Sequence, residues 1–211
     1  DIKRANPVGT LMSLKRYPVI SGLLICIVLF NIAQHATHST WTFFTIEKFD
    51  WSEKLVGYSL GFIGLLAAIV QGGLIRVIIP KLGNINSVYF GMIFYILGLS
   101  LFAFAEEGWM VFAFAIPLSL GGISGPALQG IMTNKIPDDE QGEFQGGMTS
   151  LVSLTAIIGP LLMTNLFSYF TSENSFYYFP GAPFMVGAII SFFGLIIAVR
   201  FLSGSRGGSG I

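Results

Sequence analysis

Residues 19–46 read VISGLLICIVLFNIAQHATHSTWTFFTI and contain no Lys, Arg, Asp or Glu. The hydrocarbon core of a bilayer is about 30 Å thick and needs about 20 apolar residues per helical crossing, so this run is long enough to span a membrane. Five further apolar runs with very few charges follow it, approximately at residues 55–79, 87–105, 109–133, 144–170 and 178–202. The sequence therefore predicts an all-α membrane fold with six transmembrane helices.

The composition agrees with lipid as the solvent of this fold. Of the 211 residues, 53% are hydrophobic and 10% are charged, whereas a soluble domain has about 25% charged residues. The strands of a transmembrane β-barrel alternate in segments of about ten residues. These runs are apolar over helical lengths, so we exclude a barrel. The single cysteine, Cys26, lies within the first run, and we expect it to be a small buried side chain.

The basic residues are distributed unevenly between the two ends of the predicted helices. Lys48 and Lys54 fall on one side of the membrane. The remaining Lys and Arg residues fall on the other side: Lys3, Arg4, Lys15, Arg16, Arg76, Lys81, Lys135, Arg200 and Arg206. Because cytoplasmic loops are enriched in Lys and Arg, we expect a multi-pass protein with both chain ends in the cytoplasm. The net charge of zero gives no support for nucleic-acid binding.

Three segments are expected along the chain. Residues 1–17 are typical of a cytoplasmic connector and residues 18–202 contain the six helices. Residues 203–211 are rich in Gly and Ser, as in a flexible tail or a linker left by cloning. The chain does not begin with Met and opens with no signal peptide, so we expect it to have been cut from a longer protein.

Polar side chains at membrane depth are concentrated in the first and fourth helices. The first carries amide, hydroxyl and imidazole groups, and the fourth carries Ser119, Ser124 and Gln129 among several glycines. The third and sixth helices carry mainly Phe, Ile, Leu, Ala and Gly. We therefore expect the first and fourth helices to face a cavity, and the third and sixth to face lipid.

The strongest candidates for a substrate site lie in the first helix. Asn31, His35 and His38 are spaced i, i+4 and i+7 and so share one helix face, with Gln34 beside them. Ionisable residues inside a membrane are costly and mark functional sites by default. We predict that these four residues and Gln129 contact substrate; structural hydrogen bonding and a dedicated proton site remain as alternatives. Two His without an intramembrane carboxylate predict no metal site.

Two Gly-Pro pairs interrupt the predicted helices. Gly125-Pro126 lies in the fourth helix and Gly159-Pro160 in the fifth. Proline removes a backbone donor and bends a helix, while glycine lets a neighbouring helix or a substrate approach the backbone. We predict that these four residues form hinges, with close helix packing as the alternative.

The second and fifth helices begin alike. Asp50 precedes Glu53 with the spacing of a capping box, and acidic residues 138–140 precede the fifth helix. The two helices enter the membrane from opposite faces. Such an arrangement is typical of an inverted repeat of three plus three helices.

An enzymatic interpretation is also available. Gly122-Ile123-Ser124-Gly125 matches the Gly-x-Ser-Gly pattern of rhomboid intramembrane proteases. That chemistry needs a His that activates the serine, and the rhomboid family places this His in its sixth helix. The predicted sixth helix, residues 178–202, contains no His. We therefore predict that the chain is not an enzyme.

A set of short motifs extends over nearly the whole chain: Ser39-Thr40-Trp41, Trp51-Ser52, Val56-Gly57, Ser59-Leu60, Gln71-Gly72-Gly73, Gly108-Trp109, Gly121-Gly122-Ile123, Pro126-Ala127-Leu128-Gln129, residues 140–146 and Gly159-Pro160-Leu161-Leu162. In these motifs the chain resembles the C-terminal half of a major facilitator superfamily transporter, in the tetracycline/proton antiporter branch of drug exporters. The resemblance implies a twelve-helix parent in which the six helices are the seventh to the twelfth. It also implies that residues 76–83, with Arg76, Lys81 and Gly83, occupy the place of a cytoplasmic motif.

Two positions depart from that branch. Tetracycline exporters that resemble this chain carry an Asp in the third helix of this half, where Tyr95 stands here. They also carry a His four residues before Gln71, where Ala67 stands. These differences make an amphiphilic compound other than tetracycline an equal expectation.

The expected function is therefore proton-coupled export of a small amphiphilic organic compound by alternating access, without a cofactor. The expected partners are the substrate, protons, the lipid bilayer and the N-terminal six-helix half of the same transporter. Two alternatives remain open: transport of a polar nutrient such as a sugar, and a six-helix membrane scaffold that transports nothing.

Overall fold

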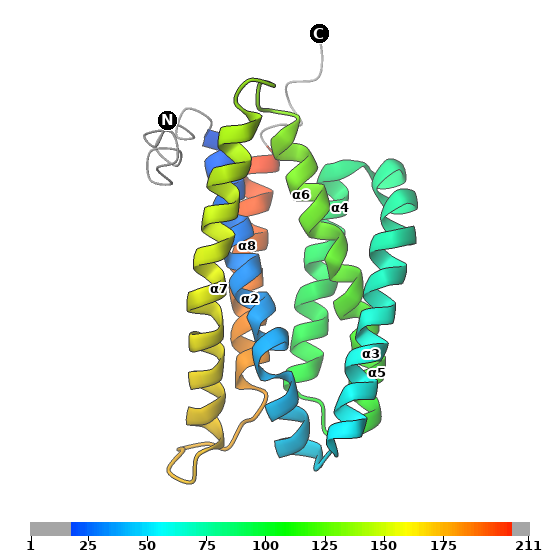
Figure 1. The fold of residues 1–211 in the computed structure, drawn as a ribbon, viewed down its shortest axis with the longest axis vertical. Helices are drawn as coiled ribbons and strands as arrows, with labels where there is room; N and C mark the ends of the chain where they lie inside the picture. Colours follow the sequence, from blue (N-terminus) through cyan, green and yellow to red (C-terminus); the bar gives the residue numbers. More distant parts are fainter. Residues whose placement is uncertain (1–17, 204–211) are drawn as a thin grey trace.

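The structure is a computed structural model that describes residues 18–203, and within this range every regular element is helical. The elements are α2 (Pro18–Phe49), α3 (Glu53–Ile69), η3 (Val70–Leu74), α4 (Ile75–Ala103), α5 (Gly108–Leu120), η4 (Gly121–Ile123), α6 (Ser124–Thr133), α7 (Gln141–Thr171) and α8 (Ala182–Ser203). They lie roughly parallel to one long axis, with α7 and α3 at opposite edges of the face shown in Figure 1. The predicted connector, residues 1–17, lies outside the described residues, as does the tail beyond Ser203.

Within residues 18–203, five helices are long and apolar enough to cross a membrane: Val19–Phe49, Glu53–Ala103, Gly108–Thr133, Gln141–Thr171 and Ala182–Ser203. An all-helical, multi-pass membrane protein is thereby confirmed. The described part of the chain thus supplies five spans where the sequence predicts six. The difference arises because the second and third predicted helices are joined into one 51-residue span.

That long span reverses direction at Gly83. A straight helix of this length would extend about 75 Å, more than twice the thickness of a bilayer core. Gly83 has φ 76° and ψ 159°, a conformation that residues with a Cβ rarely adopt. Figure 1 shows the chain running along α3 to this turn and then returning along α4 beside it. Residues 75–82 therefore continue the direction of α3, and residues 84–103 run back.

Close packing holds the returning part of α4 against α5, η4 and α6. A Cβ added to Gly98 would lie 2.7 Å from the Leu118 backbone, and one added to Gly91 would lie 2.6 Å from the Ser124 nitrogen. Small residues bring helix backbones together in this way, and in lipid such packing replaces the hydrophobic effect as the force between helices. The sequence predicted that this segment lies outermost against lipid. One of its faces is packed into the bundle, and the other carries exposed apolar side chains such as Ile93 and Leu97.

The core is aromatic at the end of the bundle where α2 ends and α3 begins. The Trp41 and Phe102 rings lie 5.2 Å apart, and the Phe44 and Phe184 rings lie 4.7 Å apart. The Trp41 indole nitrogen donates a 3.0 Å hydrogen bond to the Ser59 hydroxyl, which joins α2 to α3. These contacts fix the depth of α2 relative to its neighbours, and α2 carries the predicted site.

Two local predictions met different outcomes. Cys26 is fully buried and lies against Met92, as expected of a small buried side chain. The predicted capping box before α3 is wrong, because the N-cap of α3 is Ser52, with no side-chain hydrogen bond. Asp50 instead adopts φ 52° in the connection that follows α2.

The connection between α7 and α8 is tied to the end of α2. The Tyr178 hydroxyl donates a 2.8 Å hydrogen bond to the Glu47 carboxylate. Partial burial, this hydrogen bond and the negative charge of Glu47 together raise the pKa of the Tyr178 phenol. The contact lies at the end of the bundle opposite the Gly83 turn (Figure 1).

Candidate functional site

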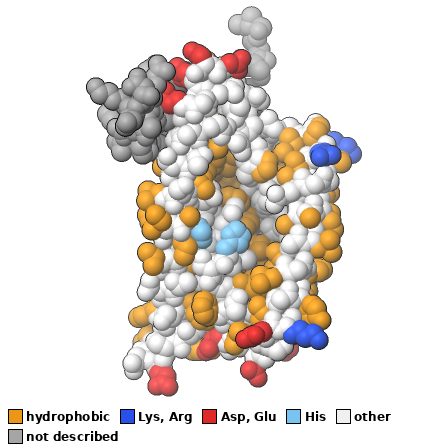
Figure 2. Space-filling model, in the orientation of Figure 1, with side chains coloured by type: hydrophobic (Ala, Val, Ile, Leu, Met, Phe, Trp, Pro, Cys, Tyr) orange, Lys and Arg blue, Asp and Glu red, His pale blue; other side chains and the backbone are white. Residues whose placement is uncertain are grey.

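A cavity of about 470 Å³ opens beside the middle of α2. Its lining comes from six elements: Phe30, Gln34, Thr37 and His38 of α2, Leu60, Ile63 and Ala67 of α3, Gln71 of η3, Tyr95 of α4, Leu118 and Ser119 of α5, and Gly122 of η4. Figure 2 shows the two His side chains in the middle of one face, next to a hollow. The first and fourth predicted helices do line a cavity, and the second predicted helix contributes as much.

Two buried hydroxyl groups in this cavity make no hydrogen bond within their own helices, and one of them, that of Thr37, interacts with the Tyr95 hydroxyl. They are the Thr37 Oγ1, in a side chain only 7% exposed, and the Ser119 Oγ. Several Ser and Thr in these helices bond back to a carbonyl three or four residues earlier, as Thr45 does to Trp41 at 3.0 Å. A buried hydroxyl with unfilled hydrogen-bonding capacity is costly. Both groups are therefore candidates to bind a molecule that enters the cavity.

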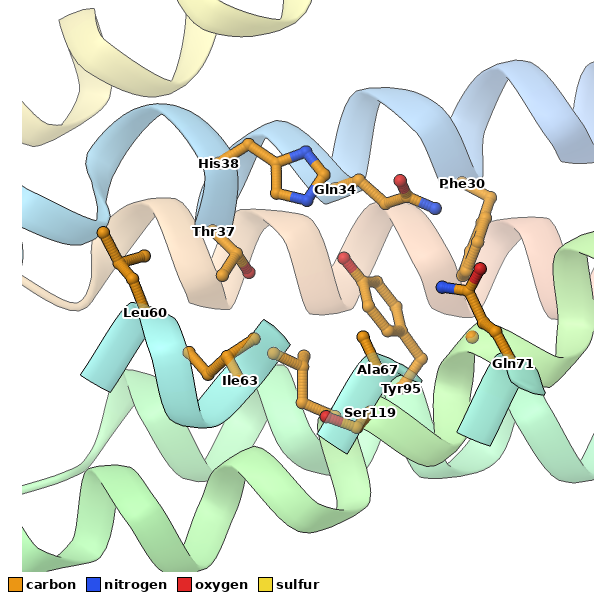
Figure 3. Close-up of a pocket in the computed structure, with 12 residues that line it drawn as sticks. Phe30, Gln34, Thr37, His38, Leu60, Ile63, Ala67, Gln71, Tyr95 and Ser119 are labelled. Carbon is orange, nitrogen blue, oxygen red and sulfur yellow. The ribbon is translucent and has the colours of Figure 1, made fainter. Parts of the chain in front are cut away.

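Tyr95 stands between the two walls of the cavity. Its ring packs against Phe30 with the centroids 4.7 Å apart. In Figure 3 its hydroxyl points toward α2, on the side where Gln34 and Thr37 lie, and the amide of Gln71 extends toward Phe30. The site thus combines aromatic and aliphatic walls with hydroxyl and amide groups, the usual composition of a small-molecule site.

Two helical irregularities border the cavity. The segment η3 is a π-helical turn that contains Gln71, and η4 is a 3₁₀ turn that contains Gly122; the two turns lie next to each other. Pro126 has no N–H to donate to the carbonyl of Gly122, which explains why the α-helix is interrupted there. Irregular backbone at membrane depth is tolerated where it lines a cavity, and π-turns occur often at functional sites.

The structure brings two of the five predicted substrate contacts to this cavity. Gln34 and His38 line it, whereas Asn31 and His35 lie on the neighbouring side of α2. Asn31 donates a 2.9 Å hydrogen bond to the carbonyl of Ile27 in its own helix. Gln129 is exposed on α6, two turns beyond Gly122 and on the same face, outside the cavity lining.

His35 packs against α7. A Cβ added to Gly159 would lie 2.2 Å from the His35 ring, so the imidazole fills the space that this glycine leaves. The His35 and His38 rings are 6.3 Å apart and nearly perpendicular, and the His35 Nδ1 lies 3.4 Å from the Ser39 hydroxyl. The structure thus places the two histidines in different surroundings, one in a helix contact and one in the cavity.

The predicted hinge residues also fall in two different places. Gly125 and Pro126 follow the η4 turn, and a Cβ added to Gly125 would meet nothing within 4 Å. Gly159 and Pro160 lie inside α7, which is continuous from Gln141 to Thr171. Whether either pair bends stays a prediction.

The remaining predicted residues lie away from the cavity. Arg76, Lys81 and Gly83 are exposed around the turn between α3 and the returning part of α4. Ser124, the serine of the rhomboid-like pattern, is fully buried and donates a 2.7 Å hydrogen bond to the Gly121 carbonyl. No group of three or more His, Cys, Asp or Glu within residues 18–203 is placed to hold a metal ion.

Similarity to known proteins supports the resemblance drawn from the motifs. The chain is 31% identical to the tetracycline resistance protein, class C, of Escherichia coli over 189 residues, which is 90% of this chain and 46% of that protein. It is 37% identical to the class B protein of Escherichia coli over 131 residues, which is 62% of this chain and 33% of that protein. The chain is a homologue of the tetracycline resistance proteins. Its resemblance to this branch of drug exporters is thereby confirmed.

More distant similarity extends to animals. The human hippocampus abundant transcript-like protein 1 is 25% identical over 213 residues, which is 93% of this chain and 42% of that protein. No family model matches the chain. The chain spans less than half the length of each of these relatives. The relatives also agree with the prediction that the chain is not an enzyme.

Proposed function

We propose that this chain is the C-terminal half of a twelve-helix secondary transporter that exports a small amphiphilic organic compound by alternating access. The observation that carries this proposal is the cavity beside α2, with its apolar walls and its uncharged hydrogen-bonding groups. Substrate sites of such transporters lie near the bilayer midplane, between helical repeats that bear irregular turns. The η3 and η4 turns at the cavity agree with that position.

The exposed faces of α3 and α7 support an interface with the N-terminal half of the transporter. Each carries a stripe of small exposed residues: Gly57, Gly61, Gly64 and Ala68 in α3, continued by Gly72 in η3, and Gly142, Gly146, Thr149, Ser153 and Ala156 in α7. A Cβ added to any of the glycines in these stripes would meet nothing within 4 Å. Small residues are the contacts through which membrane helices approach one another. The two stripes lie on helices at opposite edges of the cavity face, so a second six-helix bundle could cover them and close the cavity.

The finer topology belongs to the same proposal. The reversal at Gly83 would turn the 51-residue span into two crossings, which gives six crossings in an inverted three-plus-three repeat. Arg76 and Lys81 flank this turn, so the positive-inside rule would place it, and both chain ends, in the cytoplasm. In that position Arg76, Lys81 and Gly83 would contact the N-terminal half in one state of the cycle.

Proton coupling requires a group that changes charge. The acidic side chains of residues 18–203 lie near the helix ends or in the connections, and none lines the cavity. We therefore place the proton-carrying acid in the N-terminal half, with His35 or His38 as the alternative in this half. Gln34, His38 and Gln129 would face the substrate, while Asn31 and His35 would hold α2 against α7.

Tetracycline is the compound in the relatives' names. Tyr95 and Ala67, the two positions that depart from the tetracycline exporters, both line the cavity. A changed cavity wall supports a different amphiphilic compound as the cargo of this protein.

Transport by the protein made from its complete reading frame tests the proposal. Everted membrane vesicles are given a panel of amphiphilic compounds, with a proton gradient and after a protonophore has collapsed it. We expect gradient-dependent uptake of at least one compound. Gly122→Leu should abolish this uptake without lowering the melting temperature, because the glycine lines the cavity and its missing side chain points into open space. Full transport by the Gly122→Leu protein would show that the cavity lies off the substrate path.

A further inference from the structure

The cavity contains a cluster of hydroxyl groups that comes from three different helices. Thr37 of α2, Tyr95 of α4 and Ser119 of α5 all line it. The Ser119 oxygen is buried without a partner, and the Tyr95 hydroxyl points toward the α2 side of the cavity, where it interacts with Thr37 (Figure 3). Because the three groups line one cavity from separate elements, Thr37 and Tyr95 on one side and Ser119 on the other, they can bind polar groups of one ligand.

Among the residues that line the cavity, only His38 can carry a charge near neutral pH. The lining contains no Lys, Arg, Asp or Glu. A charged ligand at membrane depth pays a large desolvation cost unless an opposite charge faces it. A hydroxyl cluster compensates a carbonyl or hydroxyl group of a ligand and leaves a full charge unbalanced. The Phe30 and Tyr95 rings and the aliphatic side chains of α3 suit a flat or ring-shaped apolar body.

On the basis of the proposed function, we propose that Thr37, Tyr95 and Ser119 determine the substrate specificity of the cavity. They select uncharged ring compounds that present a hydrogen-bonding carbonyl or hydroxyl group. The apolar body of such a compound lies against Phe30 and α3. Its polar group fills the hydrogen-bonding capacity that the hydroxyl cluster leaves open. Permanent cations gain nothing from this wall, because it offers them no carboxylate.

The test measures binding to the purified protein made from its complete reading frame. The probes are a panel of uncharged carbonyl-bearing ring compounds headed by chloramphenicol, with tetraphenylphosphonium and ethidium as permanent cations. Thr37→Val and Ser119→Ala each remove a hydroxyl with little change of shape. A hydrogen bond of ordinary strength predicts a loss of affinity of about five- to tenfold for the uncharged compounds. Thr37→Ser keeps the hydroxyl and should retain affinity.

A matched control comes from α8. Ser191 is fully buried and its hydroxyl also lacks a partner, but it does not line the cavity. Ser191→Ala should leave affinity unchanged. Without ligand, Ser119→Ala should melt at the same or a higher temperature, because it removes an unpaired buried polar group. If a hydroxyl only stabilised the fold, its removal would not lower the affinity for ligand at an unchanged melting temperature.

The outcomes separate this inference from the proposed function. Uncharged compounds that bind with the expected losses in Thr37→Val and Ser119→Ala support both. Uncharged compounds whose affinity does not change in either substituted protein, or cations whose affinity falls as much as that of the uncharged compounds, overturn the inference and leave the proposed transport function intact. A panel of which no member is bound or transported overturns the proposed function together with the inference.

Discussion

The two Gly-Pro pairs of this protein have the same sequence and different surroundings. Gly125-Pro126 follows a 3₁₀ turn beside the cavity, and a Cβ on Gly125 would meet nothing within 4 Å. Gly159-Pro160 lies inside the unbroken helix α7, where the His35 ring fills the space beside the glycine. The difference teaches that a Gly-Pro pair permits bending only where no neighbour occupies the space it leaves. A pair whose space is filled serves packing instead.

The largest expected effect tests the filled space. Gly159→Ala would place a methyl group against the His35 ring and its Cβ. Overpacking of this kind costs about 1–3 kcal/mol, so the melting temperature in detergent should fall clearly. His35→Ala in the same protein should restore most of the loss, because the small side chain makes room for the new methyl group.

Gly125→Ala is the matched control for that measurement. It adds the same methyl group beside the other proline, where space is open. Its melting temperature should stay within the range of neutral surface changes, about 0.5 kcal/mol. Equal losses in Gly125→Ala and Gly159→Ala would erase the distinction between the two pairs.

Much of the fold could be predicted from the sequence, because lipid imposes a simple rule. A chain in hydrocarbon must satisfy its backbone within helices of about 20 residues, so apolar runs locate the helices. The same rule is silent about the connections. The segment 80–86 was expected to separate two helices, but the helix extends almost to Gly83 and resumes immediately after it. The length of an apolar run reflects the thickness of the hydrocarbon core. It does not determine the geometry of a tight turn.

The site was predicted less completely, and α2 shows why. Polar spacing identified a stripe through Asn31, His35 and His38 with Gln34 beside it. The cavity face keeps Gln34 and His38, but Phe30 and Thr37 take the places expected for Asn31 and His35. One residue of shift turns a helix face by about 100°. The shift is fixed by α7, whose Gly159 receives His35. A glycine at membrane depth in the fifth helix was visible in the sequence, but its partner on α2 was not.

Thr37 and Ser119 were missed for a different reason. A hydroxyl in a helix usually bonds to a carbonyl of its own helix, as Ser124 does to Gly121. Nothing in the sequence separates such a residue from one whose hydroxyl remains free. Only the folded structure shows that the Ser119 oxygen is buried without a partner and that the Thr37 hydroxyl meets that of Tyr95.

An intermediate effect is expected from the prolines themselves. Pro126→Ala restores a donor for the Gly122 carbonyl and should allow the helix to continue through η4. If bending at this turn accompanies alternating access, transport should slow several-fold while equilibrium binding of the substrate is retained. Pro160→Ala should change the rate little, because α7 is already continuous. A slower Pro160→Ala protein with a normal Pro126→Ala protein would reverse the assignment of the moving helix.

The smallest expected effect separates the two histidines. His38 lines the cavity, so His38→Ala should raise the apparent KM for substrate by a few-fold, the cost of one ordinary hydrogen bond. His35 is held in the α2–α7 contact, so His35→Ala should mainly lower the melting temperature through the space it leaves. The dependence of the transport rate on pH in the His35→Ala protein should match that of the unsubstituted protein. Loss of that pH dependence in His35→Ala, with a normal profile in His38→Ala, would assign proton coupling to the packed histidine.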